Sequence, residues 1–242
     1  MLTLGHVLAA LLDYRPTGEE PGVAAFVVDS REAGPGSVFV AFSGERADGH
    51  AFVADAFARG AIAALVERSP GGDWPVVDTR VAAPPHPFAA LPLVIQVNDT
   101  LRALQTVAAA WRARLDTRVI GITGSVGKTS TKELTAAVLA RRYRTLKSVG
   151  NQNNEIGVPL TLLNLRPEHE RAVIEMGMYA QGEIDLLCRL ARPVIGVVTM
   201  IGPVHMERLG SMEAIVAAKR ELVAALPEDG AAVLNVDDPR VM

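Results

Sequence analysis

A glycine-rich turn that begins at Gly124 carries the clearest chemical signal in the sequence. Gly124 and Gly127 let the backbone approach a phosphate closely, and the N–H groups at the start of a helix favour an anion. Lys128 adds a positive charge, and Thr129 offers a hydroxyl that can reach Mg²⁺. The general phosphate-loop pattern has a further glycine, and Ile122 occupies that position here. The strand-like run before the turn and the helix-like run after it still favour ATP binding over an ordinary glycine turn. The predicted nucleotide contacts here are Gly124, Ser125, Val126, Gly127, Lys128, Thr129 and Ser130.

Two ionisable residues follow later strand-like runs, where they could reach the same place. In open parallel sheets, ligands lie beyond the carboxyl ends of the strands. Glu175 lies near the end of the run 172–176, and His205 follows the run 194–199. Burying an unpaired carboxylate is costly, which favours a Mg²⁺-binding role for Glu175 over a water-exposed strand end. For His205, a metal or phosphate contact and an ordinary surface position are equally open.

Lys219 lies on the apolar stripe of a predicted helix between Ser211 and Leu226. Ile215 and Leu222 mark the buried face of that helix, and Lys219 is spaced to share it. The lysine either extends its ammonium group to water from the edge of the stripe or turns into a polar site. In a polar site it would be paired or chemically altered, because an unpaired buried ammonium is costly. The spacing leaves both readings open.

An amide-rich segment runs from Asn151 to Pro159, ahead of an apolar helical pattern. Asparagines commonly form turns. Asn153 and Asn154 could equally hydrogen-bond a substrate, and the sequence does not decide between these roles.

The elements that must position these residues change in character near residue 98. The first part has short apolar segments, a helical pattern and a strand-like run, which are typical of a small α/β domain. These elements are expected at 24–28, 37–42, 51–59 and 62–67, after a first amphipathic helix within 1–12. From Asp99, which can cap a helix, strand-like runs alternate with helical patterns and predict a parallel sheet covered by helices. These strands are expected at 119–122, 172–176, 194–199 and 231–236.

We therefore expect an α/β protein with domains at 1–98 and 99–242. Asp238-Pro239 looks like the start of another helix, so the second domain is expected to be incomplete and the chain to be a fragment.

Composition narrows the functional classes. The 242 residues are 49% hydrophobic and 21% charged, with a net charge of −3, which predicts no nucleic-acid surface. No apolar run reaches the about 18 residues of a membrane span, and the first residues lack the features of a signal peptide. We expect a cytoplasmic monomer without membrane insertion, in which the single Cys188 is a buried small hydrophobe.

Several motifs together resemble the Mur ligases over nearly the whole chain. The motifs are Thr123–Ser130, Gly150–Leu163, Ile174–Gly177, Gly182–Ile184, Ile201–His205, Ala218–Glu221 and Leu234–Asp238. Asp29-Ser-Arg31 and Asp48-Gly-His50 resemble the N-terminal UDP-sugar domain of the family. The Asn-x-Asn-Asn-Glu-Ile-Gly-Val-Pro run is most similar to the member that adds D-alanyl-D-alanine to UDP-N-acetylmuramoyl-tripeptide.

The resemblance implies an ATP-dependent ligase of peptidoglycan precursors. ATP would phosphorylate the tripeptide carboxylate, and the amine of D-alanyl-D-alanine would attack the acyl phosphate. The fold implied is a UDP-sugar domain followed by a phosphate-loop ATPase domain, without the C-terminal domain of the family, so this chain alone is expected to be inactive.

The resemblance also implies roles for individual residues. Lys128 would hold the β- and γ-phosphates, Thr129 and Glu175 would hold Mg²⁺, and His205 would help to bind a second Mg²⁺. Lys219 would be carbamylated and would thereby become an anionic metal ligand. The remaining implied contacts are Asn153 and Asn154 in the catalytic cleft, Asn235 and Asp238 near the nucleotide, and Ser30, Arg31, Gly49 and His50 near the UDP-sugar.

One departure and three alternatives accompany this interpretation. Tyr179 and Ala180 occupy a stretch where the family often has Asn and His, which puts the contacts there in doubt. The alternatives are a non-catalytic nucleotide- or UDP-sugar-binding module, the preceding ligase of the same pathway, and a small-molecule kinase. A kinase would explain Lys128 and Glu175 but neither Lys219 nor the amide-rich segment.

Overall fold

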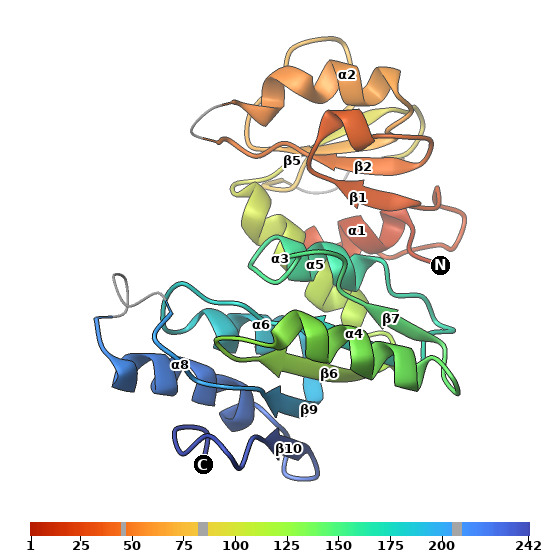
Figure 1. Ribbon diagram of the computed structural model, residues 1–242. Coiled ribbons are helices and arrows are strands. Elements are labelled where there is room, and N and C mark those ends of the chain that lie inside the picture. The colour runs from red at the N-terminus through yellow and green to blue at the C-terminus, as the bar shows by residue number, and fades with distance from the viewer. Residues whose placement is uncertain (45–46, 82–86, 205–209) are drawn as a thin grey trace. The chain divides into compact units, whose positions relative to one another are not determined.

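The computed structural model describes residues 1–44, 47–81, 87–204 and 210–242. The chain divides into two compact units, Met1–Trp111 and Arg112–Met242, and each unit is built on its own sheet (Figure 1). The sequence placed the domain boundary at residue 98, before the helix Thr100–Arg112, whereas the first unit includes nearly all of that helix.

The first unit is a five-stranded parallel sheet with helices on both faces, as Figure 1 shows. Its strand order is β1-β2-β3-β5-β4. The elements are α1 (Leu4–Leu11), β1 (Ala25–Val27), η1 (Ser30–Glu32), β2 (Ser37–Val40), η2 (Gly49–Phe52), α2 (Val53–Ala58), β3 (Ala63–Val66), β4 (Val76–Asp78), β5 (Leu93–Gln96) and α3 (Thr100–Arg112). Every residue of β2 and β3 is buried, as expected for central strands covered on both faces.

The second unit is also a five-stranded parallel sheet, in the order β10-β9-β6-β8-β7. Its elements are β6 (Arg118–Thr123), α4 (Lys128–Leu139), β7 (Thr145–Lys147), α5 (Gly157–Leu163), β8 (Arg171–Glu175), α6 (Glu183–Ala191), β9 (Pro193–Val198), α8 (Met212–Ala224) and β10 (Ala231–Leu234). The two predicted α/β regions are therefore confirmed, and the short strands β4, β5 and β7 were not predicted.

Alternate residues of β6 point to opposite faces of the sheet, and the residue on one of these faces lets α8 pack against it. Ile120 and Ile122 belong to the apolar cluster beneath α4. Gly121 lies on the alternate face, where an added Cβ would come within 2.9 Å of Leu222 on α8. Gly196 of β9 also faces Leu222, at 3.1 Å from such a Cβ. Gly121 and Gly196 thus allow α8 to lie close to the sheet. The contact is made by Leu222, about one helical turn after Lys219.

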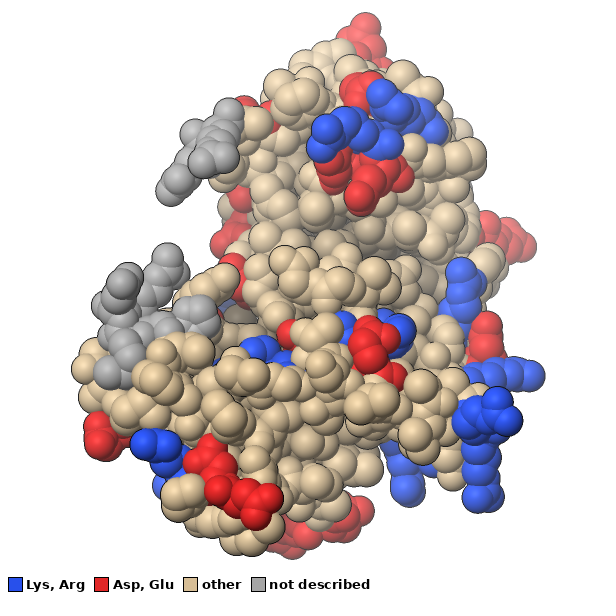
Figure 2. Space-filling model, viewed as in Figure 1, with Lys and Arg blue, Asp and Glu red and all other residues tan. Residues whose placement is uncertain are grey.

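Charged side chains on the face shown in Figure 2 form small separate groups within uncharged surface. Exposed ion pairs of the first unit, such as Arg59–Asp55 at 3.1 Å, contribute little to stability because solvent screens the two charges. Among the helices in the described ranges, none combines the length and apolar character that crossing a bilayer requires. Cys188 is buried in α6, as predicted.

Candidate active site

The predicted phosphate loop connects β6 to α4. Gly127 has φ = 89° and is the N-cap of α4, so Lys128 is the first residue of the helix. Gly124 has φ = 144°, and a Cβ there would lie 2.0 Å from Thr199 Oγ1. Both positions therefore require glycine, Gly127 for the left-handed N-cap and Gly124 for the close approach of Thr199, which follows β9.

Residues that follow β9 hold the loop in this shape. Ser125 N–H donates to the Met200 carbonyl at 2.7 Å, and Gly202 N–H donates to Ser125 Oγ at 2.9 Å. Thr199 Oγ1 donates to the Val126 carbonyl at 2.6 Å. Two successive loop positions, Ser125 and Val126, are thus tied to the segment that follows β9, and the loop is shaped without a ligand.

Lys128 is half-buried and its ammonium group donates to the Gly124 carbonyl at 2.8 Å, so it lies over the turn that it is predicted to serve. Burial lowers the pKa of Lys128, and the charge of Glu175 opposes that shift.

Glu175 ends β8 beside the first turn of α4. Thr129 Oγ1 donates to its Oε2 at 3.0 Å, and Asn153 Nδ2 donates to its Oε1 at 2.9 Å. The carboxylate is only 2% exposed, and its backbone N–H donates to Ser148 Oγ at 3.1 Å. The structure therefore brings together three of the predicted site residues.

This arrangement fits Mg²⁺ bound together with a phosphate. A hydroxyl and a carboxylate are hard oxygen ligands, and Mg²⁺ sites commonly use one or two protein carboxylates and complete the coordination with phosphate and water. Within the described ranges, no group of three or more His, Cys, Asp and Glu side chains forms an all-protein metal cage. The pair Thr129–Glu175 would supply the protein ligands.

Lys219 is buried in α8, with 2% of its surface exposed. It lines a small cavity of about 80 Å³, which Gly124, Lys128, Asn153 and Asn154 also line. Burial first, and the like charge of Lys128 second, lower the pKa of Lys219 to about 8. Among the described carboxylates, none lies within 4.0 Å of its ammonium nitrogen. The sequence left open whether Lys219 extends its ammonium group to water or turns it into a polar site. The structure supports the buried, polar site.

The other predicted residues of this unit have structural contacts. Asn154 Oδ1 accepts from Gly157 N–H at 2.8 Å and so holds the turn that leads into α5. Asn235 Nδ2 donates to the Thr199 carbonyl at 2.9 Å, and Asp238 Oδ2 accepts from Ile201 N–H at 2.7 Å. That backbone hydrogen bond lowers the pKa of Asp238.

Asn235 and Asp238 therefore brace the segment that holds the phosphate loop, and their predicted contact with the nucleotide stays a prediction. His205 lies outside the described residues. Val126 and Ser130 lie in the loop and in the first turn of α4, with Val126 largely exposed.

Sequence reasoning missed Lys132 and Thr199. Lys132 is fully buried in α4, with its ammonium nitrogen 3.5 Å from Glu175 Oε2 and 3.1 Å from the Gly150 carbonyl. Its spacing of one helical turn from Lys128 was an available signal, because it places both lysines on one face of α4. Thr199 gave no such signal, since its role depends on which strand lies beside β6.

A separate, larger pocket of about 760 Å³ lies in the first unit. Ser30, Arg31 and Gly49 are among its lining residues, and Phe39 and Phe42 provide apolar walls. Arg31 pairs with Asp29 at 2.5 Å, and its guanidinium holds the pKa of Asp29 at about 2. Three of the four residues predicted to lie near the UDP-sugar are thus brought to one cavity.

The fourth, His50, is 5% exposed and is not among the residues that line this pocket. Its ring is hydrogen-bonded at both nitrogens, to Asp48 and to the backbone of Glu67. Contact of His50 with a ligand stays a prediction.

Comparison with known proteins agrees with this geometry. Residues 122–242 match the family described as Mur ligase middle domain, and residues 23–112 match the Mur ligase family, catalytic domain. The UDP-N-acetylmuramoyl-tripeptide–D-alanyl-D-alanine ligase of Bacillus subtilis is 46% identical over 93% of this chain and 46% of its own length.

Two solved structures extend the comparison. A crystal structure of MurF from Acinetobacter baumannii superimposes with a TM-score of 0.80 at 34% identity, over 99% of this chain and 50% of that one. The MurF ligase of Thermotoga maritima, solved in complex with ADP, gives 0.73 at 33% identity, over 89% of this chain and 46% of that one. The chain spans about half the length of the relatives it matches. With both compact units matched, we conclude that the chain belongs to the Mur ligase family.

Proposed function

We propose that this chain forms the N-terminal and central parts of an ATP-dependent ligase that joins D-alanyl-D-alanine to UDP-N-acetylmuramoyl-tripeptide. The observation that carries the proposal is the contact between Thr129 and Glu175, at 3.0 Å, beside a phosphate loop that is already shaped. The names of the Bacillus subtilis relative and of the MurF structures support this pair of substrates. The ADP in the Thermotoga maritima structure supports the nucleotide.

ATP would lie with its phosphates over the turn from Gly124 to Lys128. The backbone N–H groups at the start of α4 would bind the phosphate oxygens, and the Lys128 ammonium would exchange the Gly124 carbonyl for a phosphate oxygen. Thr129 and Glu175 would hold Mg²⁺, which neutralises charge on the transferring phosphoryl group.

The reaction has two balanced steps. A carboxylate oxygen of the tripeptide attacks the γ-phosphorus, the bond to the β-phosphate oxygen breaks, and ADP leaves. The amine nitrogen of D-alanyl-D-alanine then attacks the acyl carbon, and the tetrahedral intermediate loses phosphate and a proton to give the amide. Asn153 would keep the Glu175 carboxylate turned toward the loop, and Lys128 would face the charge that develops on the phosphoryl oxygens.

Lys219 would act as a carbamate in this site. The ammonium group first loses one proton, and the neutral amine then adds to CO₂ with formation of an N–C bond and release of a second proton, so a cation becomes an anion. The support is its burial in a cavity with Lys128, where a positive charge is disfavoured. A signal from ¹³C-labelled bicarbonate that is present in the wild type and absent in Lys219→Ala would establish the carbamate, and its absence from both would disprove it.

The pocket of the first unit would hold the UDP part of the other substrate. Ser30 and Arg31 line it beside the apolar walls of Phe39 and Phe42, a combination that suits a charged diphosphate joined to a planar base. Direct titration of this chain with UDP tests the pocket without any catalysis.

The whole activity is tested with the complete gene product. Phosphate release should require both UDP-N-acetylmuramoyl-tripeptide and D-alanyl-D-alanine. Release with the dipeptide precursor and a free diamino acid would identify the preceding ligase instead, and binding of ATP and UDP without turnover would identify a non-catalytic module.

Variants sharpen this test. Lys128→Ala should abolish turnover and weaken ATP binding, whereas Lys147→Ala, an exposed lysine of β7, should leave both unchanged. We also expect a cytoplasmic monomer, which cell fractionation and analytical ultracentrifugation would test.

A further inference from the structure

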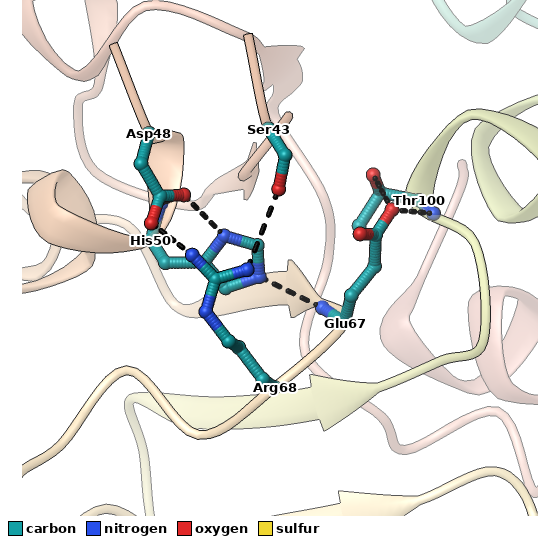
Figure 3. A network of polar contacts seen from close by, with 6 residues as sticks. All are labelled: Ser43, Asp48, His50, Glu67, Arg68 and Thr100. Carbon is teal, nitrogen blue, oxygen red and sulfur yellow. Dashed lines mark hydrogen bonds and ion pairs between the residues drawn. The ribbon is translucent and has the colours of Figure 1, made fainter.

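His50 is the centre of a polar network in the first unit (Figure 3). Its Nδ1 lies 2.7 Å from Asp48 Oδ1, and its Nε2 lies 2.9 Å from the backbone nitrogen of Glu67. Arg68 holds the second oxygen of Asp48, and the Glu67 carboxylate accepts from Thr100 N–H at 3.0 Å. The imidazole thus connects η2 to the end of β3.

These contacts determine the tautomer of His50. The backbone of Glu67 can only donate, so Nε2 must accept and carries no proton. The proton then lies on Nδ1, where the carboxylate of Asp48 accepts it. Protonation of the ring at Nε2 would place two donors face to face, and the connection to β3 would be lost.

The segment that His50 holds forms one wall of the large pocket. Phe42, Gly44, Ala47 and Gly49 all line that pocket. Gly49 N–H donates to the Phe42 carbonyl at 2.8 Å, and a Cβ on Gly49 would lie 2.7 Å from that oxygen. The two ends of the wall are therefore locked together. In Figure 3, His50 and Arg68 both join this stretch to the residues that follow β3, His50 through the backbone N–H of Glu67 and Arg68 through contacts with Asp48 and Ser43.

We propose that His50 is a positioning residue: as a neutral imidazole it fixes the pocket wall made by Phe42, Gly44, Ala47 and Gly49 against the end of β3. It would thereby set the width of the nucleotide-diphosphate pocket without touching the ligand. This role rests on the proposed binding of UDP. It differs from a ligand contact, because both ring nitrogens already have protein partners.

Three substitutions separate positioning from contact. His50→Ala leaves the Glu67 N–H without its acceptor and should weaken UDP binding about tenfold. In His50→Gln the side-chain oxygen can reach the place of Nε2, so affinity should stay within about threefold of the wild type. His50→Asn is too short to reach Glu67 and should resemble the alanine variant. The matched control is His169→Ala in the second unit. His169 Nδ1 also accepts a backbone N–H, that of Arg166 at 2.9 Å, so the substitution removes the same kind of hydrogen bond away from the pocket.

Calorimetry with UDP and ¹⁵N NMR of this chain provide the readouts. The wild-type His50 Nε2 should show the shift of an unprotonated acceptor before and after UDP is added, and protection of the Glu67 amide from exchange should fall in the Ala and Asn variants only. A direct change at Nε2 on UDP binding, or wild-type affinity in His50→Ala, would overturn the positioning role. Failure of the wild type to bind UDP would instead overturn the proposed pocket, together with the role that depends on it.

Discussion

The buried pair Lys132–Glu175 should make a measurable contribution to the stability of the second unit. Lys132→Met keeps most of the side-chain volume and removes the charge. At 3.5 Å, the two charges attract by about 5 kcal/mol at an effective dielectric constant of about 20, and desolvation of both groups offsets much of that. Breaking a buried pair commonly costs about 3–5 kcal/mol, because the remaining charge loses its partner.

The remaining contacts of Glu175 reduce this cost. Thr129 and Asn153 still donate to both carboxylate oxygens, whereas the Gly150 carbonyl loses its donor. We therefore expect Lys132→Met to lower the free energy of unfolding by about 2–3 kcal/mol.

The assay is urea unfolding followed by circular dichroism, for Lys132→Met, Glu175→Gln and the double variant. The double variant should be more stable than the sum of the single effects predicts, with a coupling energy of at least about 1 kcal/mol. Lys147→Met is the matched control, because Lys147 pairs with Glu133 at the surface, where solvent screening should leave little effect on the free energy of unfolding. Additive single effects, or equal losses for Lys132→Met and Lys147→Met, would refute the reasoning.

Three further outcomes follow from the geometry. Gly124→Ala should weaken ADP binding by at least about tenfold in calorimetry, because its Cβ would collide with Thr199 Oγ1 at 2.0 Å, and unchanged affinity would contradict the loop as described. Thr129→Val should lose Mg²⁺-dependent ATP binding while Thr129→Ser retains it; equal binding by both would remove the hydroxyl from the metal site. Burial raises the pKa of Cys188 from 9.0 to about 12, so its folded-state pKa lies above the unfolded one, and its contribution to stability is present below about pH 9 and is lost as pH rises toward 12. Between about pH 8 and about pH 10.5, the free energy of unfolding should therefore fall more for the wild type than for Cys188→Ala. Equal falls in the two proteins would show that the thiol is not shielded from water.

The elements with strong periodicity were predictable from the sequence, and those that depend on a neighbour were not. The apolar runs of β6, β8 and β9 and the stripe of α8 are local patterns, and the structure confirms them. The strand β7 has only three residues, none of them fully buried, and exists because it pairs with β8. No pattern within Thr145–Lys147 could have shown that.

The candidate site divides in the same way. The glycines and Lys128 of the phosphate loop were predictable because their spacing is itself the chemical requirement. Lys219 was placed on the buried stripe, but only the packing of α8 showed that it faces Lys128 in a cavity. Lys132 was missed because a lysine in a helix is usually exposed, and its burial depends on a carboxylate from another strand.

The hydrogen bonds from Ser125 and Thr199 have a kinetic consequence for the nucleotide cycle. The conformational entropy of the phosphate loop is lost when the protein folds, so ATP does not have to order the loop when it binds. Association should then proceed without a slow rearrangement of this segment. In the proposed reaction, ADP would meet the same loop after phosphoryl transfer. The difference in residence time between ATP and ADP must therefore come from contacts to the γ-phosphate and its metal, and not from opening of the turn.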